Sequence, residues 1–252
     1  MKEDNVRGED FQESTKYIRG KPLPGRMIQS GEPDAFKIYK SCIGVIKLPE
    51  PDREGGNSLR SVLNRRRTRR KFSSMPLTLP ELSNLLWCHQ GLNLNRVGIP
   101  LRTAPSAGAL FPTETYIIVN NVEGLQRGLY HYLVREHSLE FLKEENLAEE
   151  AAGVAADQKF VRNAAVLFVF TSVITRCSRK YLDRAYRFIY LDAGHIGENL
   201  HLAATDMNLG ACPIAAFYDE EIDKLIGVDG KEETAIYMYA VGNLQGTPFL
   251  KL

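Results

Sequence analysis

A chain of 252 residues with 44% apolar and 25% charged residues can bury the core of one large globular domain or of two small ones. Its net charge of +1 and its pI near 7.7 exclude a protein that binds nucleic acid over its whole surface. The charged N-terminus lacks the apolar region of a signal peptide, and the longest apolar run, 164–170, is much shorter than a membrane-spanning helix. We therefore expect a cytoplasmic protein without a membrane partner.

The predicted elements follow one another in an irregular order. Residues 1–56 are largely polar, with prolines and glycines at 20–25, and we expect an extended N-terminal arm there. Residues 57–252 then form the folded domain. Apolar periodicity and capping residues predict helices over 57–63, 78–91, 146–156, 179–208 and 219–227. Short β-branched and aromatic runs predict strands over 115–119, 128–133, 138–142, 165–171 and 235–242. This order indicates the α+β class.

The four cysteines are Cys42, Cys88, Cys177 and Cys212, and no two of them form a CxxC pair. No histidines stand in pairs at the spacing of metal ligands, and His89 and His131 show no partner in the sequence. The sequence thus predicts free thiols and no metal site.

The most distinctive stretch is 65–72, Arg-Arg-Arg-Thr-Arg-Arg-Lys-Phe, in which six of the eight residues are cationic. Such a patch can bind nucleic acid, a membrane surface, a sorting receptor or a small phosphate, or it can be the solvated end of a helix. Aromatic residues are not interleaved with the charges, which argues against nucleic acid. The chain has neither GxGxxG nor GxxxxGK(S/T), so arginine side chains would have to hold a phosphate through paired hydrogen bonds.

Four stretches resemble those of the nitroreductase-like flavoproteins and, within them, the SagB-type (thiazole- and oxazole-forming) dehydrogenases. They are residues 66–72 with 76–87 behind them, 104–114 with 128–132, 180–199, and 212–217. The resemblance implies a nitroreductase-like α+β fold with a central mixed, mainly antiparallel sheet flanked by helices. It also implies an intertwined homodimer that binds FMN at its interface.

The resemblance assigns the residues that would bind FMN. The phosphate and the ribityl chain would be held by Arg66, Arg67, Thr68 and Arg70. The other subunit would line the flavin with small residues that let the backbone approach a flat ring, namely Pro105, Ser106, Ala107 and Gly108. The amide of Gln158 would read the pyrimidine edge. The N5 region would face Pro213, Ile214, Ala215 and Ala216, although many relatives carry a glutamate where Ala215 stands. Lys251 corresponds to basic residues that follow the last strand in relatives.

Lys180 and Tyr181 match a pair that assists proton removal in azoline-oxidising relatives, although two polar residues at a helix start are also a common solvated surface. A lysine base needs a pKa lowered by burial or by a neighbouring cation, and Arg179 and Arg184 are near in sequence. We expect His195 to be a buried, hydrogen-bonded helix residue rather than a base.

The resemblance implies an FMN-dependent oxidoreductase that transfers hydride between the flavin N5 and an organic substrate or NAD(P)H. The substrate would be a peptide azoline or a small electrophile. One alternative is a non-catalytic scaffold subunit of a peptide-modifying, azoline-forming complex. Another is a nucleic-acid-binding protein that uses the basic stretch. The partners that we predict are instead a second copy of the chain and a small-molecule or peptide substrate.

Overall fold

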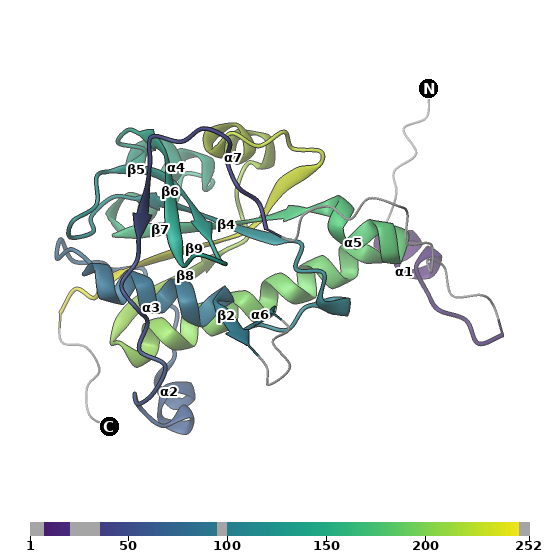
Figure 1. Ribbon diagram of the computed structural model, residues 1–252, viewed down its shortest axis with the longest axis horizontal. Coiled ribbons are helices and arrows are strands. Elements are labelled where there is room, and N and C mark those ends of the chain that lie inside the picture. The colour runs from purple at the N-terminus through teal and green to yellow at the C-terminus, as the bar shows by residue number, and fades with distance from the viewer. Residues whose placement is uncertain (1–7, 21–35, 95–99, 247–252) are drawn as a thin grey trace.

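A seven-stranded sheet forms the centre of the molecule (Figure 1). The computed structural model describes residues 8–20, 36–94 and 100–246. The strand order is β1-β6-β5-β4-β7-β9-β8, and each neighbouring pair in it is antiparallel. The strands are β1 (Gly44–Lys47), β4 (Thr113–Val119), β5 (Gly128–Leu133), β6 (Ser138–Glu144), β7 (Val166–Val173), β8 (Leu209–Ile214) and β9 (Glu233–Asn243). A separate two-stranded sheet consists of β2 (Leu92–Leu94) and β3 (Pro100–Arg102).

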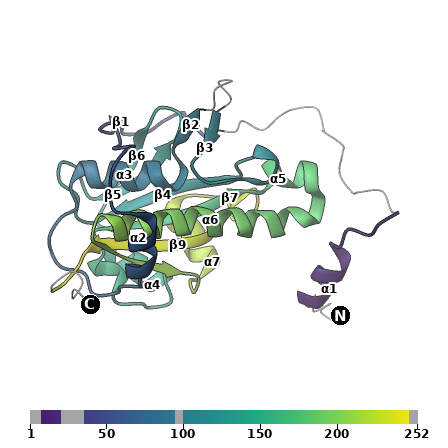
Figure 2. The ribbon, with the colours of Figure 1, turned by 90° about the horizontal axis from the view of Figure 1, so that it is seen from below.

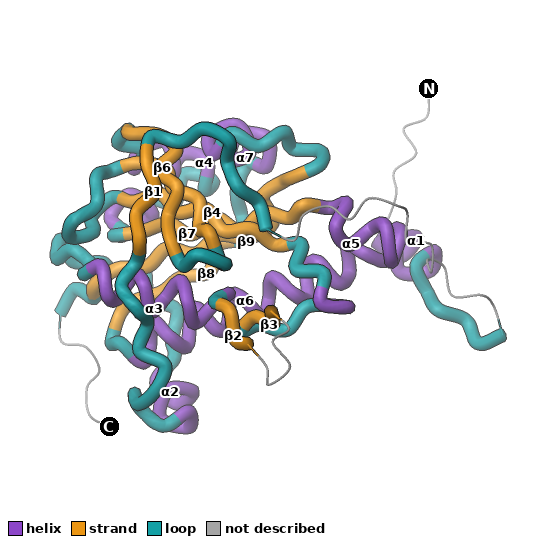
Figure 3. Tube along the Cα trace, viewed as in Figure 1, coloured by secondary structure: helices purple, strands orange, loops and turns teal. Residues whose placement is uncertain are grey.

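Helices cover both faces of the large sheet, which gives three layers (Figures 2 and 3). The helices are α1 (Gly8–Ser14), α2 (Leu59–Arg65), α3 (Leu79–Gln90), α4 (Ala148–Val154), α5 (Ile174–Tyr181), α6 (Ala185–Asp206) and α7 (Asp219–Ile226). Buried residues of α3 and α6 share one apolar cluster with the sheet, and those of α4 and α7 share a second. The predicted α+β fold with a mainly antiparallel sheet flanked by helices is confirmed.

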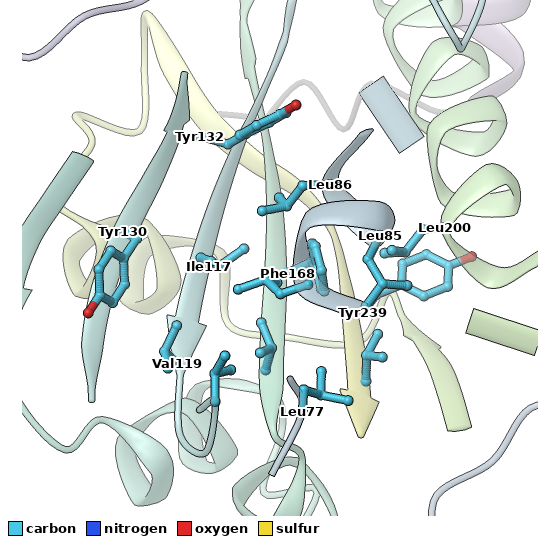
Figure 4. Packing of buried hydrophobic residues seen from close by; sticks show 14 of the residues in the cluster. Leu77, Leu85, Leu86, Ile117, Val119, Tyr130, Tyr132, Phe168, Leu200 and Tyr239 are labelled. Carbon is cyan, nitrogen blue, oxygen red and sulfur yellow. The ribbon is translucent and has the colours of Figure 1, made fainter. Parts of the chain in front are cut away.

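Successive residues of the central strands point into opposite layers. In β4, Ile117 packs on the α3–α6 side, whereas Ile118 packs on the α4–α7 side. β7 alternates in the same way between Phe168 and Val169. Figure 4 shows Ile117 and Phe168 with Leu85 of α3 in the first of these layers. Because both faces of β7 are covered, its sequence is a continuous apolar run, which is why it could be predicted.

The α3 helix begins as the sequence predicts. The Thr78 side chain accepts a hydrogen bond from the amide of Glu81, and the Glu81 carboxylate accepts one from the amide of Thr78. This capping box satisfies donors that the first turn leaves without a helical partner. The helix ends at Gly91, where a Cβ atom would lie 2.2 Å from Cδ1 of Trp87, so the close approach of that ring requires glycine.

The helix predicted over 179–208 is wrong at its N-terminal end. The structure has two helices there, α5 and α6, separated by a short 3-10 turn at Leu182–Arg184. Leu182 adopts φ 48° and ψ −137°, a left-handed backbone conformation that stops α5. Apolar periodicity continues across the break, so the pattern could not reveal it.

Two strands of the large sheet were not predicted. The edge strand β8 contains Gly210 and Pro213, residue types that are depleted in strands. The opposite edge strand, β1, has only four residues and lies inside the predicted N-terminal arm, together with α1. The domain boundary between residues 56 and 57 stays a prediction.

Across residues 8–20, 36–94 and 100–246, no helix is long and apolar enough to cross a membrane. In the same ranges, no group of three or more His, Cys, Asp and Glu side chains could hold a metal ion. The four cysteines are free thiols.

Candidate functional site

The basic stretch is an extended segment that lies along β8. Helix α2 ends at Arg65, and the amide of Arg66 donates to the carbonyl of Val62 at its C-terminus. Thr68 then forms a parallel bridge with Ala211, and the amide of Arg69 donates to the Ala211 carbonyl at 2.9 Å. The stretch thus extends the edge of the sheet and is not the solvated end of a helix.

Three arginine side chains of this segment have local contacts that do not neutralise their positive charge. Nε of Arg66 lies 3.9 Å from Oε1 of Glu198 on α6, which is a long ion pair. Nη1 of Arg67 donates to the carbonyls of Asn64 and Arg66 at 3.0 and 2.7 Å. The guanidinium of Arg70 lies 5.8 Å from the centre of the Phe160 ring. We call Arg66, Arg67, Thr68 and Arg70 the arginine cluster.

Further predicted site residues gather at the same edge of the sheet. Burial raises the pKa of the Cys212 thiol on β8, and the nearby charge of Arg70 opposes this shift. Pro213 and Ile214 are the last residues of β8. Nε2 of Gln158 donates to the carbonyl of Ala216 at 3.1 Å, so the predicted amide residue contacts the predicted N5-facing segment. The residues that meet here form the β8 group, which consists of the arginine cluster, Gln158 and residues 213–216.

A second group forms around Gly108. Gly108 has φ +66°, and a Cβ atom there would lie 2.6 Å from Nζ of Lys180 and 2.7 Å from the hydroxyl oxygen of Tyr181. The two polar side-chain ends therefore converge on the same point of the backbone. Both side chains are half-buried at the end of α5. The Gly108 group consists of residues 105–108, Lys180 and Tyr181.

One residue of this region was not predicted as a site residue from the sequence. Asp192 on α6 is 4% exposed, and its carboxylate accepts hydrogen bonds from the hydroxyl of Ser106 and the amide of Ala107. Asp192 lies inside the family-like stretch 180–199, but no role was assigned to it from the sequence. His195, one turn later, is exposed, so the expectation that it is buried is wrong. Lys251 lies outside the described residues.

The two groups attach to different parts of α6. Asp192 holds the Gly108 group, whereas Glu198 and His201 contact the arginine cluster, the latter through Nε2 and the carbonyl of Arg67 at 3.3 Å. Six to nine residues at 1.5 Å per residue separate these anchors by about 9–14 Å along the helix axis. Figure 2 shows α5 at one end of α6 and α2 towards the other. Within one chain the groups are therefore neighbours on a helix but do not share an anchor.

Apolar side chains are exposed on the same helices. Tyr190 and Leu191 of α6 are 58% and 60% exposed, and Leu59 and Leu63 of α2 are 64% and 50% exposed. Leu59 and Leu63 are one helical turn apart, so they lie on the same face of α2. Clustered exposed apolar residues of this kind mark surfaces that associate with another molecule.

Comparisons with known proteins show the family to which the chain belongs. The family model described as "Nitroreductase family" matches residues 63–243. A protein of Methanocaldococcus jannaschii that is named as a nitroreductase is 36% identical over 170 residues, covering 68% of this chain and 84% of the relative. The trifolitoxin-processing protein of Rhizobium leguminosarum is 29% identical over 157 residues, covering 60% of this chain and 42% of the relative.

Two solved structures have the same fold. A crystal structure from Anabaena variabilis, described as a nitroreductase, superposes with a TM-score of 0.71 at 30% identity, covering 81% of this chain and 42% of that chain. The Escherichia coli microcin synthetase complex with a truncated precursor peptide bound contains a chain with a TM-score of 0.62 at 19% identity, covering 96% of this chain and 84% of that chain. The nitroreductase-like resemblance, with its link to peptide-processing relatives, is thereby confirmed.

Proposed function

The chain belongs to the nitroreductase family, and we propose that it is an FMN-dependent oxidoreductase whose proton-transfer pair is Lys180 and Tyr181. The family relation supports a flavin-type oxidoreductase. FMN itself, the substrate and the roles of the individual residues are the parts that we propose.

The β8 group has the donor chemistry that FMN requires. Guanidinium groups bind phosphate through charge-assisted, often paired, hydrogen bonds, and Arg66, Arg67 and Arg70 lie within five residues of one another. Thr68 adds a hydroxyl group between them. Nε2 of Gln158 already donates to the carbonyls of Ala155 and Ala216 at 2.8 and 3.1 Å, so its Oε1 is the atom that can accept a hydrogen bond from the polar edge of a flat heterocycle. We therefore assign the phosphate and the pyrimidine edge of FMN to this group.

The Gly108 group brings two polar side-chain ends to one point of the backbone. The missing side chain at Gly108 leaves room for Nζ of Lys180 and the hydroxyl of Tyr181, which lie 2.6 and 2.7 Å from where a Cβ atom would be. The β8 group and the Gly108 group have separate anchors on α6, and apolar residues are exposed nearby on α2 and α6. We propose that a homodimer completes the site, with the β8 group of one chain facing the Gly108 group of its partner.

When bound, FMN supplies the hydride acceptor or donor at N5. Lys180 and Tyr181 would supply the proton transfer. Nζ of Lys180 accepts a proton from the substrate or returns one, and the Tyr181 hydroxyl donates a hydrogen bond at the same point. A positioned acid or base of this kind contributes about 10²–10⁴-fold to a rate.

The convergence of Lys180 and Tyr181 on Gly108 is the observation that carries this proposal, and it favours catalysis over a scaffold role. The trifolitoxin-processing relative favours a peptide substrate, and for such a substrate we propose oxygen as the electron acceptor. The nitroreductase relatives support reduction of a small electrophile by NAD(P)H. Both reactions would use Lys180 and Tyr181, and they differ in the molecule that would lie on the open face of the flavin ring.

The test combines FMN titration with turnover. We expect the purified protein to bind FMN and to oxidise NAD(P)H with a quinone or nitroarene, or to oxidise an azoline peptide. Lys180→Ala should lower kcat by about 10²–10³-fold and leave FMN bound. Lys224→Ala, an exposed lysine on α7, is the control and should keep wild-type turnover. A protein that retains no flavin after unbound FMN has been removed, or a Lys180→Ala variant with full activity, contradicts the proposal.

A further inference from the structure

The loop over residues 106–111 has an unusual backbone. Gly108, Ala109 and Phe111 have φ values of 66°, 55° and 46°, all in the left-handed region. Glycine adopts this region freely, but alanine and phenylalanine do not, because the Cβ atom approaches the following carbonyl oxygen. Two disfavoured residues within three positions persist only where surrounding contacts hold them, and such strain is concentrated at functional sites.

One carboxylate provides several of those contacts, beside the hydrogen bond from Nη1 of Arg176 to the carbonyl of Phe111 at 3.3 Å. Oδ2 of Asp192 accepts a hydrogen bond from the Ser106 hydroxyl at 2.6 Å, and its two oxygens lie 3.2 and 3.3 Å from the amide nitrogen of Ala107. The Ser106 oxygen in turn accepts from the amide of Phe111 at 2.9 Å. Asp192 therefore fixes the start of the loop directly and its end through one hydroxyl group.

The space behind the loop is nearly full. A cavity of about 10 Å³ lies there, lined by residues that include Asp192, Ser106, Phe111 and Ile196. The loop cannot fold back into so small a space. Burial raises the pKa of Asp192, whereas the hydrogen bonds from Ser106 and Ala107 act in the opposite direction because they favour the charged form.

We propose that Asp192 is a positioning residue, which holds the 106–111 loop so that Gly108 sets the places of Lys180 and Tyr181. Asp192 binds Ser106 and Ala107, and these fix the adjacent Gly108. The polar ends of Lys180 and Tyr181 lie 2.6 and 2.7 Å from where a Cβ atom of Gly108 would be, so they occupy the space that this backbone position leaves open. This inference rests on the proposed function of Lys180 and Tyr181. It extends that function to a residue on another helix.

The chain contains a matched control for a merely structural role. Asp223 on α7 is 5% exposed, and it too accepts one hydroxyl and one amide hydrogen bond, from Thr234 at 2.8 Å and from Ala235 at 2.6 Å. Asp192→Asn and Asp223→Asn therefore make the same chemical change at the same burial. Only the first lies against the Gly108 group.

The experiment is a double-mutant cycle in the FMN-loaded protein. Asp192→Asn should lower kcat by about 10- to 100-fold, because a carbonyl oxygen replaces two acceptors and the loop shifts. In the Lys180→Ala background the same change should cost less than about threefold, because the group being positioned is gone. Asp223→Asn should keep kcat within about twofold in both backgrounds. An equal loss from Asp192→Asn in both backgrounds, or no loss in either, overturns the proposal.

A second variant and a second measurement distinguish a failure of the positioning role from a failure of the proposed function. Ser106→Ala breaks the link to Phe111 without altering the charge, and it should give a smaller loss that is also absent in the Lys180→Ala background. The NMR signal of ¹³C-dimethylated Lys180, assigned with Lys180→Arg, should shift in Asp192→Asn and not in Asp223→Asn. This readout needs no turnover, so an inactive wild-type protein would refute the proposed function while the signal still tests Asp192. An unshifted Lys180 signal in Asp192→Asn overturns the positioning role.

Discussion

Two charged regions of the molecule differ in how well their charges are matched. In the interior, His131 lies between two carboxylates, with Nδ1 2.8 Å from Oε2 of Glu140 and Nε2 3.2 Å from Oε2 of Glu114. Nη1 of Arg176 lies 2.5 Å from the other oxygen of Glu114. At the edge of the sheet, the arginine cluster has three cations, and Arg66 lies 3.9 Å from the carboxylate of Glu198. We call Glu114, His131, Glu140 and Arg176 the carboxylate network.

The carboxylate network also holds the described segment that precedes β1. The amides of Lys37 and Tyr39 donate to Glu114 and Glu140 at 3.2 and 2.9 Å. Each carboxylate therefore has both a cation or histidine and a backbone partner. Buried charges are tolerated when they are paired in this way, and they then specify one arrangement of the chain.

The two charged regions should therefore have different roles, one in the stability of the fold and the other in ligand binding. A charge that is matched inside the fold stabilises the fold, whereas a surplus of one sign at a surface favours an ion from outside. The carboxylate network should therefore control stability and pH dependence. The arginine cluster should control FMN affinity and its response to salt.

The largest expected effect is on stability. Glu114→Gln removes the negative charge between Arg176 and His131 and leaves buried cations without compensation. We expect a loss of about 3–5 kcal/mol in the free energy of unfolding, measured with urea. Glu149→Gln breaks an exposed ion pair with Arg162 and should cost less than about 1 kcal/mol. Equal losses in the two variants would show that the interior charges are not matched as described.

Substitutions in the arginine cluster should weaken FMN binding and leave the free energy of unfolding almost unchanged. Arg66→Ala and Arg70→Ala each remove a charged hydrogen-bond donor worth about 1.5–3 kcal/mol, so each should weaken FMN binding by about 10- to 100-fold. The free energy of unfolding without FMN should change by less than about 0.5 kcal/mol. Lys71→Ala, an exposed neighbour, is the control for total charge. Unchanged FMN affinity in both arginine variants would refute the phosphate assignment.

Histidines in the two regions should give pH dependences of opposite sign. Burial lowers the pKa of His131, but the hydrogen bonds and charges of Glu114 and Glu140 outweigh it and raise the pKa above 6.5. The folded state then holds the proton more tightly than the unfolded chain. The stabilisation is complete below pH 6.5 and is lost as pH rises through the folded pKa. His131→Gln should flatten this alkaline loss in urea unfolding.

The pKa of His201, which lies beside the arginine cluster, shifts in the opposite direction. Burial lowers its pKa, and the charge of Arg66 lowers it further, so stability falls as pH drops below 6.5. His89 contributes in the same direction, because burial lowers its pKa to about 3. His201→Gln should reduce the acid loss in part. If His131→Gln flattened the acid side instead, the network would not hold a protonated histidine.

The sequence predicts those parts of the molecule that depend on local patterns. The capping box at Thr78, the buried strand β7 and the glycine at the end of α7 each follow from neighbouring residues. The identity of the arginine cluster also follows from the sequence. Its conformation does not, because an extended segment along β8 depends on pairing with a strand that contains Gly210 and Pro213.

Contacts between segments that lie far apart in the sequence could not be predicted from local sequence patterns. His131 and Glu140 face each other because the hairpin of β5 and β6 has that register, and Arg176 arrives from a helix that periodicity did not separate from α6. Gly108 and Lys180 likewise lie close together although they are 72 positions apart in the sequence. Lys180 and Tyr181 could thus be assigned only by resemblance. Asp192 stands in the same family-like stretch, but its role depends on contacts with Ser106 and Ala107 that only the fold shows.

The smallest expected effect is the response to salt. Screening acts over about 10 Å at 0.1 M ionic strength, and it weakens charge pairs at a surface far more than buried ones. Raising NaCl from 0.05 to 0.3 M should therefore weaken FMN binding a few-fold, and the Arg66→Ala, Arg70→Ala double variant should lose most of this dependence. The urea midpoint without FMN should move little over the same range, because the carboxylate network is excluded from solvent. A salt-insensitive FMN affinity would mean that the arginine surplus is not what binds the phosphate, even though the buried network behaves as described.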